Sequence, residues 1–136
     1  KDTMQLAAFN NNNFPLGQAS VMVNEGLPLY MVAKLEQQYD LSDMTVGILG
    51  MAFKAGSDDI RSSLAYKLKR ILRFKARRVL THDPFVSVDP GLVPLETVLE
   101  ESDLLIVAAP HEMYRDLEPG VPVVDIWNLR AHGDRI

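Results

Sequence analysis

The sequence contains no cysteine among its 136 residues. This absence excludes disulfide bonds, thiolate metal sites and a cysteine nucleophile within these residues. The chain also has no run approaching the roughly 20 apolar residues that span a bilayer. No basic and then apolar leader opens it. We therefore expect a cytoplasmic protein without a membrane partner.

The sequence also lacks a surplus of basic residues. Its formal net charge is -4, whereas nucleic-acid binders usually carry a positive surplus, so we expect no nucleic-acid partner. Half of the Lys and Arg residues fall between positions 67 and 78, where we expect them to form one face of a helix. No histidine has a second histidine at metal-ligand spacing, and we expect no metal site.

Hydrophobic residues make up 47% of the chain and charged residues 24%, as in an ordinary globular protein with a core. The length fits a single domain. The chain opens on Lys1 rather than methionine and enters in the middle of a pattern. We therefore expect it to be a piece cut from a longer polypeptide.

The first third of the chain predicts helices. Residues 3–9 predict a short helix, which the asparagine run at 10–13 ends, and residues 16–39 predict a long one. Pro28 is expected to kink the long helix or to split it in two. Apolar residues lie nearly all around this helix, which favours a homodimer through residues 16–39.

Strands and helices alternate after Asp40. Strands are predicted at 45–49, 79–82, 104–108 and 123–127, and helices at 60–74 and 95–101. This alternation implies right-handed crossovers and a mostly parallel sheet. The predicted fold class is therefore α/β, a Rossmann-like three-layer domain preceded by a long helix. We expect residues 1–40 to form a helical dimerisation region and residues 41–136 the α/β domain.

The most informative stretch is the loop that follows the first predicted strand, at residues 50–63. The loop contains Lys54 and Arg61, and the N-terminus of a predicted helix comes next. Two cations beside free helix amides at the carboxyl end of a parallel strand favour an anionic, phosphorylated ligand. The glycines at 47, 50 and 56 do not have the spacing of a dinucleotide-binding fingerprint.

In this order, the motifs resemble the C-terminal half of the UDP-glucose/GDP-mannose dehydrogenase family. The opening Lys1-Asp2 resembles the pair that follows the family's catalytic cysteine, and residues 16–28 resemble its central dimerisation helix. Residues 50–63 match its G-x-x-F-K-x-x-x-x-D-x-R-x-S loop. Three further motifs follow in the family's order, namely Asp83-Pro84, Pro110-His111 and Asp125.

The resemblance implies residue roles. Lys1 and Asp2 would be catalytic, the lysine stabilising negative charge on oxygen and the aspartate positioning or deprotonating water. Phe53 and Lys54 would bind the nucleotide sugar, and Arg61 would reach the cofactor across a domain cleft. The alternative interpretations without a ligand are that Lys54 is a solvated loop lysine and that Arg61 pairs with Asp58 or Asp59.

Three other residues have two interpretations each. Asp83 follows the second strand, where a dinucleotide fold places a ribose-binding acid, although the turn preference of Asp-Pro favours a turn. His111 lies at the ligand-facing edge, where it is an acid, a base, a hydrogen-bond donor or a structural group. Trp127 stands where many relatives carry an arginine, and it either stacks on a base or packs under the sheet.

The function implied is that of an NAD-dependent dehydrogenase that oxidises a UDP-sugar or GDP-mannose to the uronic acid. In such relatives an N-terminal domain binds NAD, and a cysteine forms the covalent intermediates. This chain would bind the nucleotide sugar and contribute to the dimer, and it would be inactive alone. The alternative is a noncatalytic α/β module that binds a nucleotide or merely dimerises.

Overall fold

The computed structural model describes residues 2–9 and 13–130. The elements follow one another as α1 (Asp2–Phe9), α2 (Pro15–Leu35), η1 (Leu41–Asp43), β1 (Thr45–Leu49), α3 (Leu64–Leu72), β2 (Arg78–His82), α4 (Leu95–Glu101), β3 (Leu104–Val107), η2 (Glu112–Tyr114) and β4 (Val123–Asp125). The two η elements are single turns of 3-10 helix.

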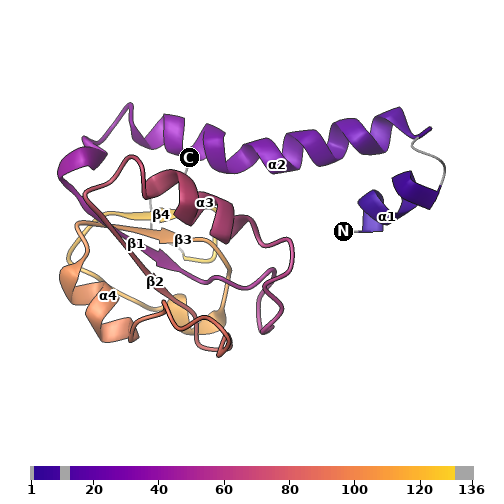
Figure 1. The fold of residues 1–136 in the computed structure, drawn as a ribbon. Helices are drawn as coiled ribbons and strands as arrows, with labels where there is room; N and C mark the ends of the chain where they lie inside the picture. The colour runs from indigo at the N-terminus through magenta and orange to yellow at the C-terminus, as the bar shows by residue number, and fades with distance from the viewer. Residues whose placement is uncertain (1, 10–12, 131–136) are drawn as a thin grey trace.

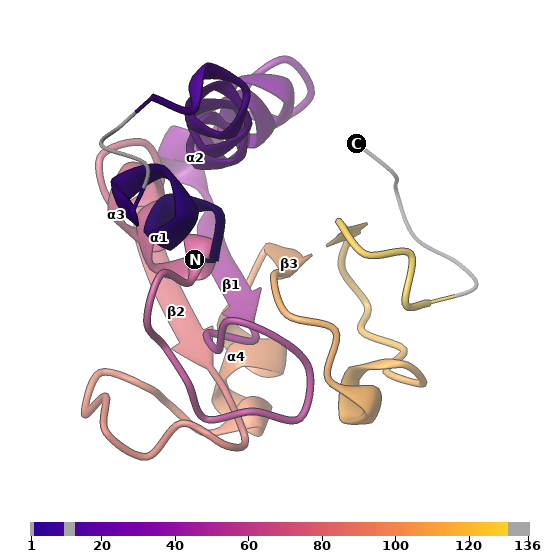
Figure 2. The same cartoon turned by 90° about the vertical axis from the view of Figure 1, so that its right-hand side faces the viewer.

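The four strands form one sheet in the order β2-β1-β3-β4. Every neighbouring pair is parallel, with Val46 of β1 opposite Val79 on one side and Leu104 on the other. The predicted α/β class with a parallel sheet is therefore confirmed. Because the strands are parallel, their carboxyl ends meet at one edge, and the loop between β1 and α3 runs across it (Figure 2).

The core lies in two layers, one on each face of the sheet. Val46, Ile48 and Ile106 face α2 and α3, while Leu49, Leu105 and Val107 face α4. The alternation follows from the strand period of two, and strands buried on both faces read as continuous apolar runs. On α3, the buried residues Ala65, Leu68 and Leu72 recur at helical spacing and cover the sheet.

The long helix α2 is continuous through Pro28, so of the two expected effects of this proline, a kink or a split in two, the split is wrong. The proline itself is buried, and Met31, Val32 and Leu35 after it pack into the main core. This packing holds the C-terminal part of α2 on the domain. The helix therefore continues past Pro28, although proline lacks the backbone N–H that would donate to the preceding turn. The N-terminal part continues beyond the sheet, and α1 folds back beneath it (Figure 1).

Several predicted boundaries are wrong, and the long helix α2 ends at Leu35 rather than at residue 39. Helix α3 begins at Leu64 rather than near residue 60, because Ser62 adopts a left-handed backbone (φ 59°) and Ser63 caps the helix. Strand β4 ends at Asp125, two residues early. The Asp125 carboxylate accepts hydrogen bonds from Trp127 N and Arg130 N and turns the chain away from the sheet.

Among the described residues, no helix combines the length and the apolar character that crossing a membrane requires.

Candidate functional site

The loop of residues 50–63 leaves β1 through a tight backbone contact. Gly50 has a left-handed backbone (φ 91°), and its N–H donates to His82 O at 2.8 Å. A Cβ on Gly50 would come within 2.7 Å of the Ala109 backbone nitrogen and 2.8 Å of its oxygen. Only glycine fits both the conformation and the approach. The start of the loop is thereby pressed between the carboxyl ends of β2 and β3.

Asp83, just after β2, fixes the next residues of the loop. Its Oδ2 accepts hydrogen bonds from Met51 N at 2.6 Å and Ala52 N at 2.8 Å, while its Oδ1 accepts from Phe85 N and Val86 N. The turn interpretation of Asp83 is confirmed. The ribose-binding interpretation is wrong, because the carboxylate is fully buried and faces these donors.

The electrostatics of Asp83 follow from this arrangement. Burial alone would raise its pKa, but hydrogen bonds from His111 and from the backbone amides of Phe85, Ala52 and Met51 hold the pKa well below the usual aspartate range. Asp83 is therefore an anion with a structural role. Its charge holds the loop against the sheet edge.

His111 holds the tip of the same loop. Its Nε2 lies 3.0 Å from Asp83 Oδ2, and its Nδ1 accepts a hydrogen bond from Gly56 N at 3.1 Å. The side chain is fully buried. This placement agrees with the structural interpretation of His111 and leaves no ring nitrogen exposed to act as an acid or a base.

Several backbone amides of the loop donate hydrogen bonds within the protein. Beyond those already named, Phe53 N donates to Asp59 O at 2.7 Å, and Asp59 N donates to Ser57 Oγ. At the start of α3, Ser63 Oγ accepts from Ala65 N. These amides are therefore not available to an anion, whereas the cationic side chains of Lys54 and Arg61 lie on the exposed surface.

Phe53 and Lys54 lie on the outer side of the loop. Phe53 is 43% exposed although its backbone is hydrogen-bonded, and Lys54 is exposed beside it. The anchored backbone below them and the free side chains above are the arrangement expected of a ligand-binding loop. The roles predicted for these two residues stay predictions.

Arg61 forms a fork with Asp59. Its Nε and Nη2 donate to the two carboxylate oxygens at 2.9 Å each. This is the pairing predicted by the alternative interpretation of Arg61 as a partner of Asp58 or Asp59. The hydrogen bond and the charge of Asp59 raise the pKa of Arg61, so the guanidinium remains cationic, and it lies on the exposed surface.

A cavity of about 310 Å³ lies where the loop faces the two N-terminal helices. It is lined by Thr3 of α1, by Ser20, Val21, Asn24 and Glu25 of α2, and by Phe53 and Ser62 of the loop. Hydroxyl, amide and carboxylate groups beside an aromatic ring are the groups that sugars contact in proteins. The structure thus brings together the loop and the first turn of α1, which carries Asp2. Lys1 lies outside the described residues.

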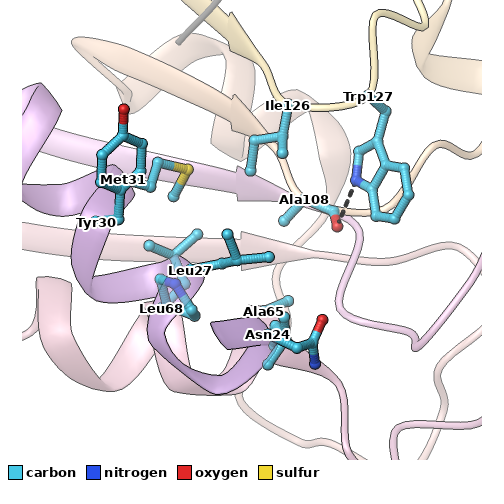
Figure 3. Close-up of a pocket in the computed structure, with 11 residues that line it drawn as sticks. Asn24, Leu27, Tyr30, Met31, Ala65, Leu68, Ala108, Ile126 and Trp127 are labelled. Carbon is cyan, nitrogen blue, oxygen red and sulfur yellow. Dashed lines mark hydrogen bonds between the residues drawn. The ribbon is translucent and has the colours of Figure 1, made fainter. Parts of the chain in front are cut away.

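A second cavity, of about 350 Å³, lies between α2 and the ends of β3 and β4 (Figure 3). Its walls are mostly apolar, with Leu27 and Met31 from α2 on one side and Ile126 on another. Asn24 lines both cavities, so they are neighbours along α2.

Trp127 forms one wall of this second cavity and is 52% exposed. Its indole N–H donates to Ala108 O at 3.0 Å, which fixes the ring at the sheet edge (Figure 3). The residue therefore lies outside the core, and packing beneath the sheet is the wrong interpretation. The stacking interpretation stays a prediction.

Sequence reasoning missed the link between Asp83 and His111 and the polar lining of the first cavity. The signal for the link was the position of both residues just after parallel strands, on either side of β1 in the sheet order. The cavity depends on how α1 and α2 pack, which no local pattern records. The described part of the chain contains no cluster of three or more potential metal-ligating His, Cys, Asp or Glu side chains.

The fold and site define a parallel α/β domain with the loop of residues 50–63 at the carboxyl ends of its strands. Residues 47–131 match the model of the UDP binding domain of the UDP-glucose/GDP-mannose dehydrogenase family. Since the match covers more than half of the sequence, the chain belongs to this family.

The chain is similar to curated and structurally characterised dehydrogenases. It is 29% identical over 122 residues to the UDP-N-acetyl-D-mannosamine dehydrogenase of Pyrococcus horikoshii, covering 86% of this chain and 29% of that protein. A UDP-glucose 6-dehydrogenase of Haloferax volcanii is 43% identical over 67 residues, covering 49% of this chain and 16% of the relative.

Among solved structures, a UDP-glucose dehydrogenase from Pyrobaculum islandicum matches with a TM-score of 0.77 and 29% identity. The match covers 91% of this chain and 32% of that one. The chain therefore spans about a third or less of the length of the relatives that it matches.

Proposed function

We propose that this chain is the nucleotide-sugar-binding part of an NAD-dependent nucleotide-sugar 6-dehydrogenase. The observation that carries the proposal is the cavity between α1, α2 and the loop, where Phe53 and Ser62 face hydroxyl and amide groups of the helices. Family membership supplies the reaction class. The substrate is a UDP-sugar or GDP-mannose, oxidised at C6 to the uronic acid.

In this proposal, the chain's residues have distinct tasks. Phe53 packs against the sugar nucleotide, and the exposed Lys54 ammonium pairs with the diphosphate. Asp2, on the first turn of α1 beside the cavity, and its neighbour Lys1 act on the reacting carbon and its water.

NAD does not fit the turn after β1. A dinucleotide would need the amides of that turn for its pyrophosphate, whereas the N–H groups of Met51 and Ala52 donate to Asp83. We propose that NAD is held by another part of the enzyme. Arg61, with its exposed guanidinium, extends toward the cofactor from this side.

A lysine substitution tests the binding proposal. Lys54→Ala should weaken binding of UDP-glucose, UDP-N-acetyl sugars or GDP-mannose, whichever binds the chain, by roughly tenfold or more, as expected for the loss of a charged hydrogen bond. Calorimetric titration measures the dissociation constants. The matched control is Lys75→Ala, which removes an exposed lysine paired with Glu36. Equal losses in both variants, or no binding by the unsubstituted chain, would favour the noncatalytic alternative.

We further propose that residues 1–40 form the dimerisation region of a homodimer, paired through residues 16–39, and that residues 41–136 form the domain that binds the nucleotide sugar. Support comes from large apolar side chains of α2 that face solvent, namely Leu16, Met22, Val23, Leu27, Leu29 and Tyr30. Residues of this kind on one helix favour burial against a partner.

A charge placed on this surface tests the dimer. Leu29 is 62% exposed, and Leu29→Glu should raise the dimer dissociation constant at least about tenfold, because a buried leucine contributes roughly 1.5–3 kcal/mol. Analytical ultracentrifugation measures the change. The control is Phe74→Glu, at an 86% exposed apolar residue outside α2. A dimer insensitive to the first change and disrupted by the second would place the interface elsewhere.

A further inference from the structure

His111 connects two segments that are distant in the sequence. It follows β3, and its ring packs against Phe85 at a centroid distance of 4.9 Å and Tyr114 at 5.7 Å. Its two nitrogens contact Asp83 and Gly56, at 3.0 and 3.1 Å. With two aromatic rings packed beside it and a partner at each nitrogen, the imidazole is held in one orientation.

The hydrogen-bond partners also determine where the ring carries its proton. A backbone N–H can only donate, so Nδ1, which faces Gly56, carries no hydrogen. The anionic carboxylate of Asp83 can only accept, so Nε2 carries the hydrogen. The ring is therefore neutral, in the Nε2–H tautomer.

The loop is consequently anchored at two points on either side of its exposed side chains. Asp83 holds Met51 and Ala52 before Phe53 and Lys54, and His111 holds Gly56 after them. Gly56 has a left-handed backbone (φ 63°), and a Cβ there would meet no atom within 4 Å. The loop tip is thus held by polar contact rather than by packing around this residue.

We propose that His111 is a positioning residue for substrate binding, which fixes the loop so that Phe53 and Lys54 face the ligand without a search through loop conformations. This inference rests on the proposed function of the loop. The imidazole is buried and has no free nitrogen, so it acts through the loop backbone and does not touch the ligand. Prior ordering of a binding loop lowers the entropic cost of binding.

The hydrogen bond from Gly56 N–H to His111 depends on Nδ1 being unprotonated. A second proton on Nδ1 would turn a donor toward the Gly56 N–H and break that bond. The ionisable groups that face the ring are the Asp83 carboxylate after β2 and the Tyr114 phenol of η2. Burial raises the pKa of Tyr114, so it remains neutral. The hydrogen bond to Gly56 therefore requires the neutral ring.

Substitution of the ring tests the proposal. His111→Phe keeps an aromatic ring but removes both nitrogens, and it should raise the UDP-glucose dissociation constant roughly five- to tenfold, as for one lost net hydrogen bond. It should also accelerate hydrogen exchange at the Gly56 amide. The matched control, His82→Phe, removes a nearby imidazole that contacts Val93 O rather than the loop, and it should change the affinity less than about twofold.

Nitrogen NMR of the unsubstituted chain separates positioning from a merely structural role. The spectra should show Nδ1 unprotonated and Nε2 protonated at neutral pH, as the contacts with Gly56 and Asp83 require. This measurement needs no variant to fold.

Each outcome decides one claim. Wild-type affinity in His111→Phe, or a protonated Nδ1 at neutral pH, would overturn the positioning role and leave the proposed function intact. A chain that binds none of the sugar nucleotides would overturn the proposed function, and the positioning role with it. Rapid exchange of the Gly56 amide at neutral pH in the unsubstituted chain would show that the anchor is absent.

Discussion

Gly50→Ala should destabilise the fold by roughly 3 kcal/mol, combining the cost of a left-handed backbone with that of overpacking. The new methyl group would meet the backbone of Ala109 rather than a movable side chain, at 2.7 Å from its nitrogen. Relief would require β1 and the segment after β3 to separate. Urea unfolding followed by circular dichroism measures the loss.

Gly56→Ala is the matched control within the same loop. Its backbone is also left-handed, but a Cβ there has open space around it. The expected cost is therefore about 1 kcal/mol, the backbone contribution alone. Equal costs for the two substitutions would mean that the close approach of Gly50 to Ala109 does not exist in solution.

Asp83→Asn is the second change with a large expected effect, a loss of roughly 3 kcal/mol in unfolding free energy at neutral pH. The carboxylate accepts from Met51 N, Ala52 N and His111 Nε2 through one oxygen. An amide has one acceptor oxygen, and its NH₂ group would face donors. Asp116→Asn, at an exposed position, serves as the control and should be nearly neutral.

The same substitution should flatten the acid dependence of stability. The folded-state pKa of Asp83 is depressed, so its contribution is fully present above the unfolded pKa of about 3.9 and is lost as pH falls toward the folded value. The unsubstituted chain should lose stability below about pH 4 more steeply than Asp83→Asn does. Parallel acid profiles for the two proteins would contradict the assignment of this charge to the loop anchor.

Much of the fold could be predicted from the sequence because its patterns are local. Apolar runs at 45–49 and 104–108 alternate with amphipathic segments, and only a parallel sheet with crossover helices buries both. Two of the boundary errors occurred where side chains redirect the backbone. Ser63 delays the start of α3, and Asp125 ends β4 early.

The candidate site was less predictable because its key contacts are distant in the sequence. The positions of Phe53 and Lys54 on a loop after β1 follow from the strand pattern. The use of the loop amides by Asp83 and His111 does not, since these residues lie about 30 and 55 positions away in the chain. The amides of Met51, Ala52 and Gly56 are therefore not available to a phosphate, and in the proposal the Lys54 ammonium pairs with it.

The most direct test of the account is a crystal structure of the chain with UDP-glucose or GDP-mannose, whichever binds in solution. We expect ligand density in the cavity between α1, α2 and residues 53–62, with the diphosphate within hydrogen-bond distance of Lys54 Nζ and the loop still held by Asp83 and His111. Density elsewhere, with Lys54 and Phe53 in contact with solvent only, would contradict it.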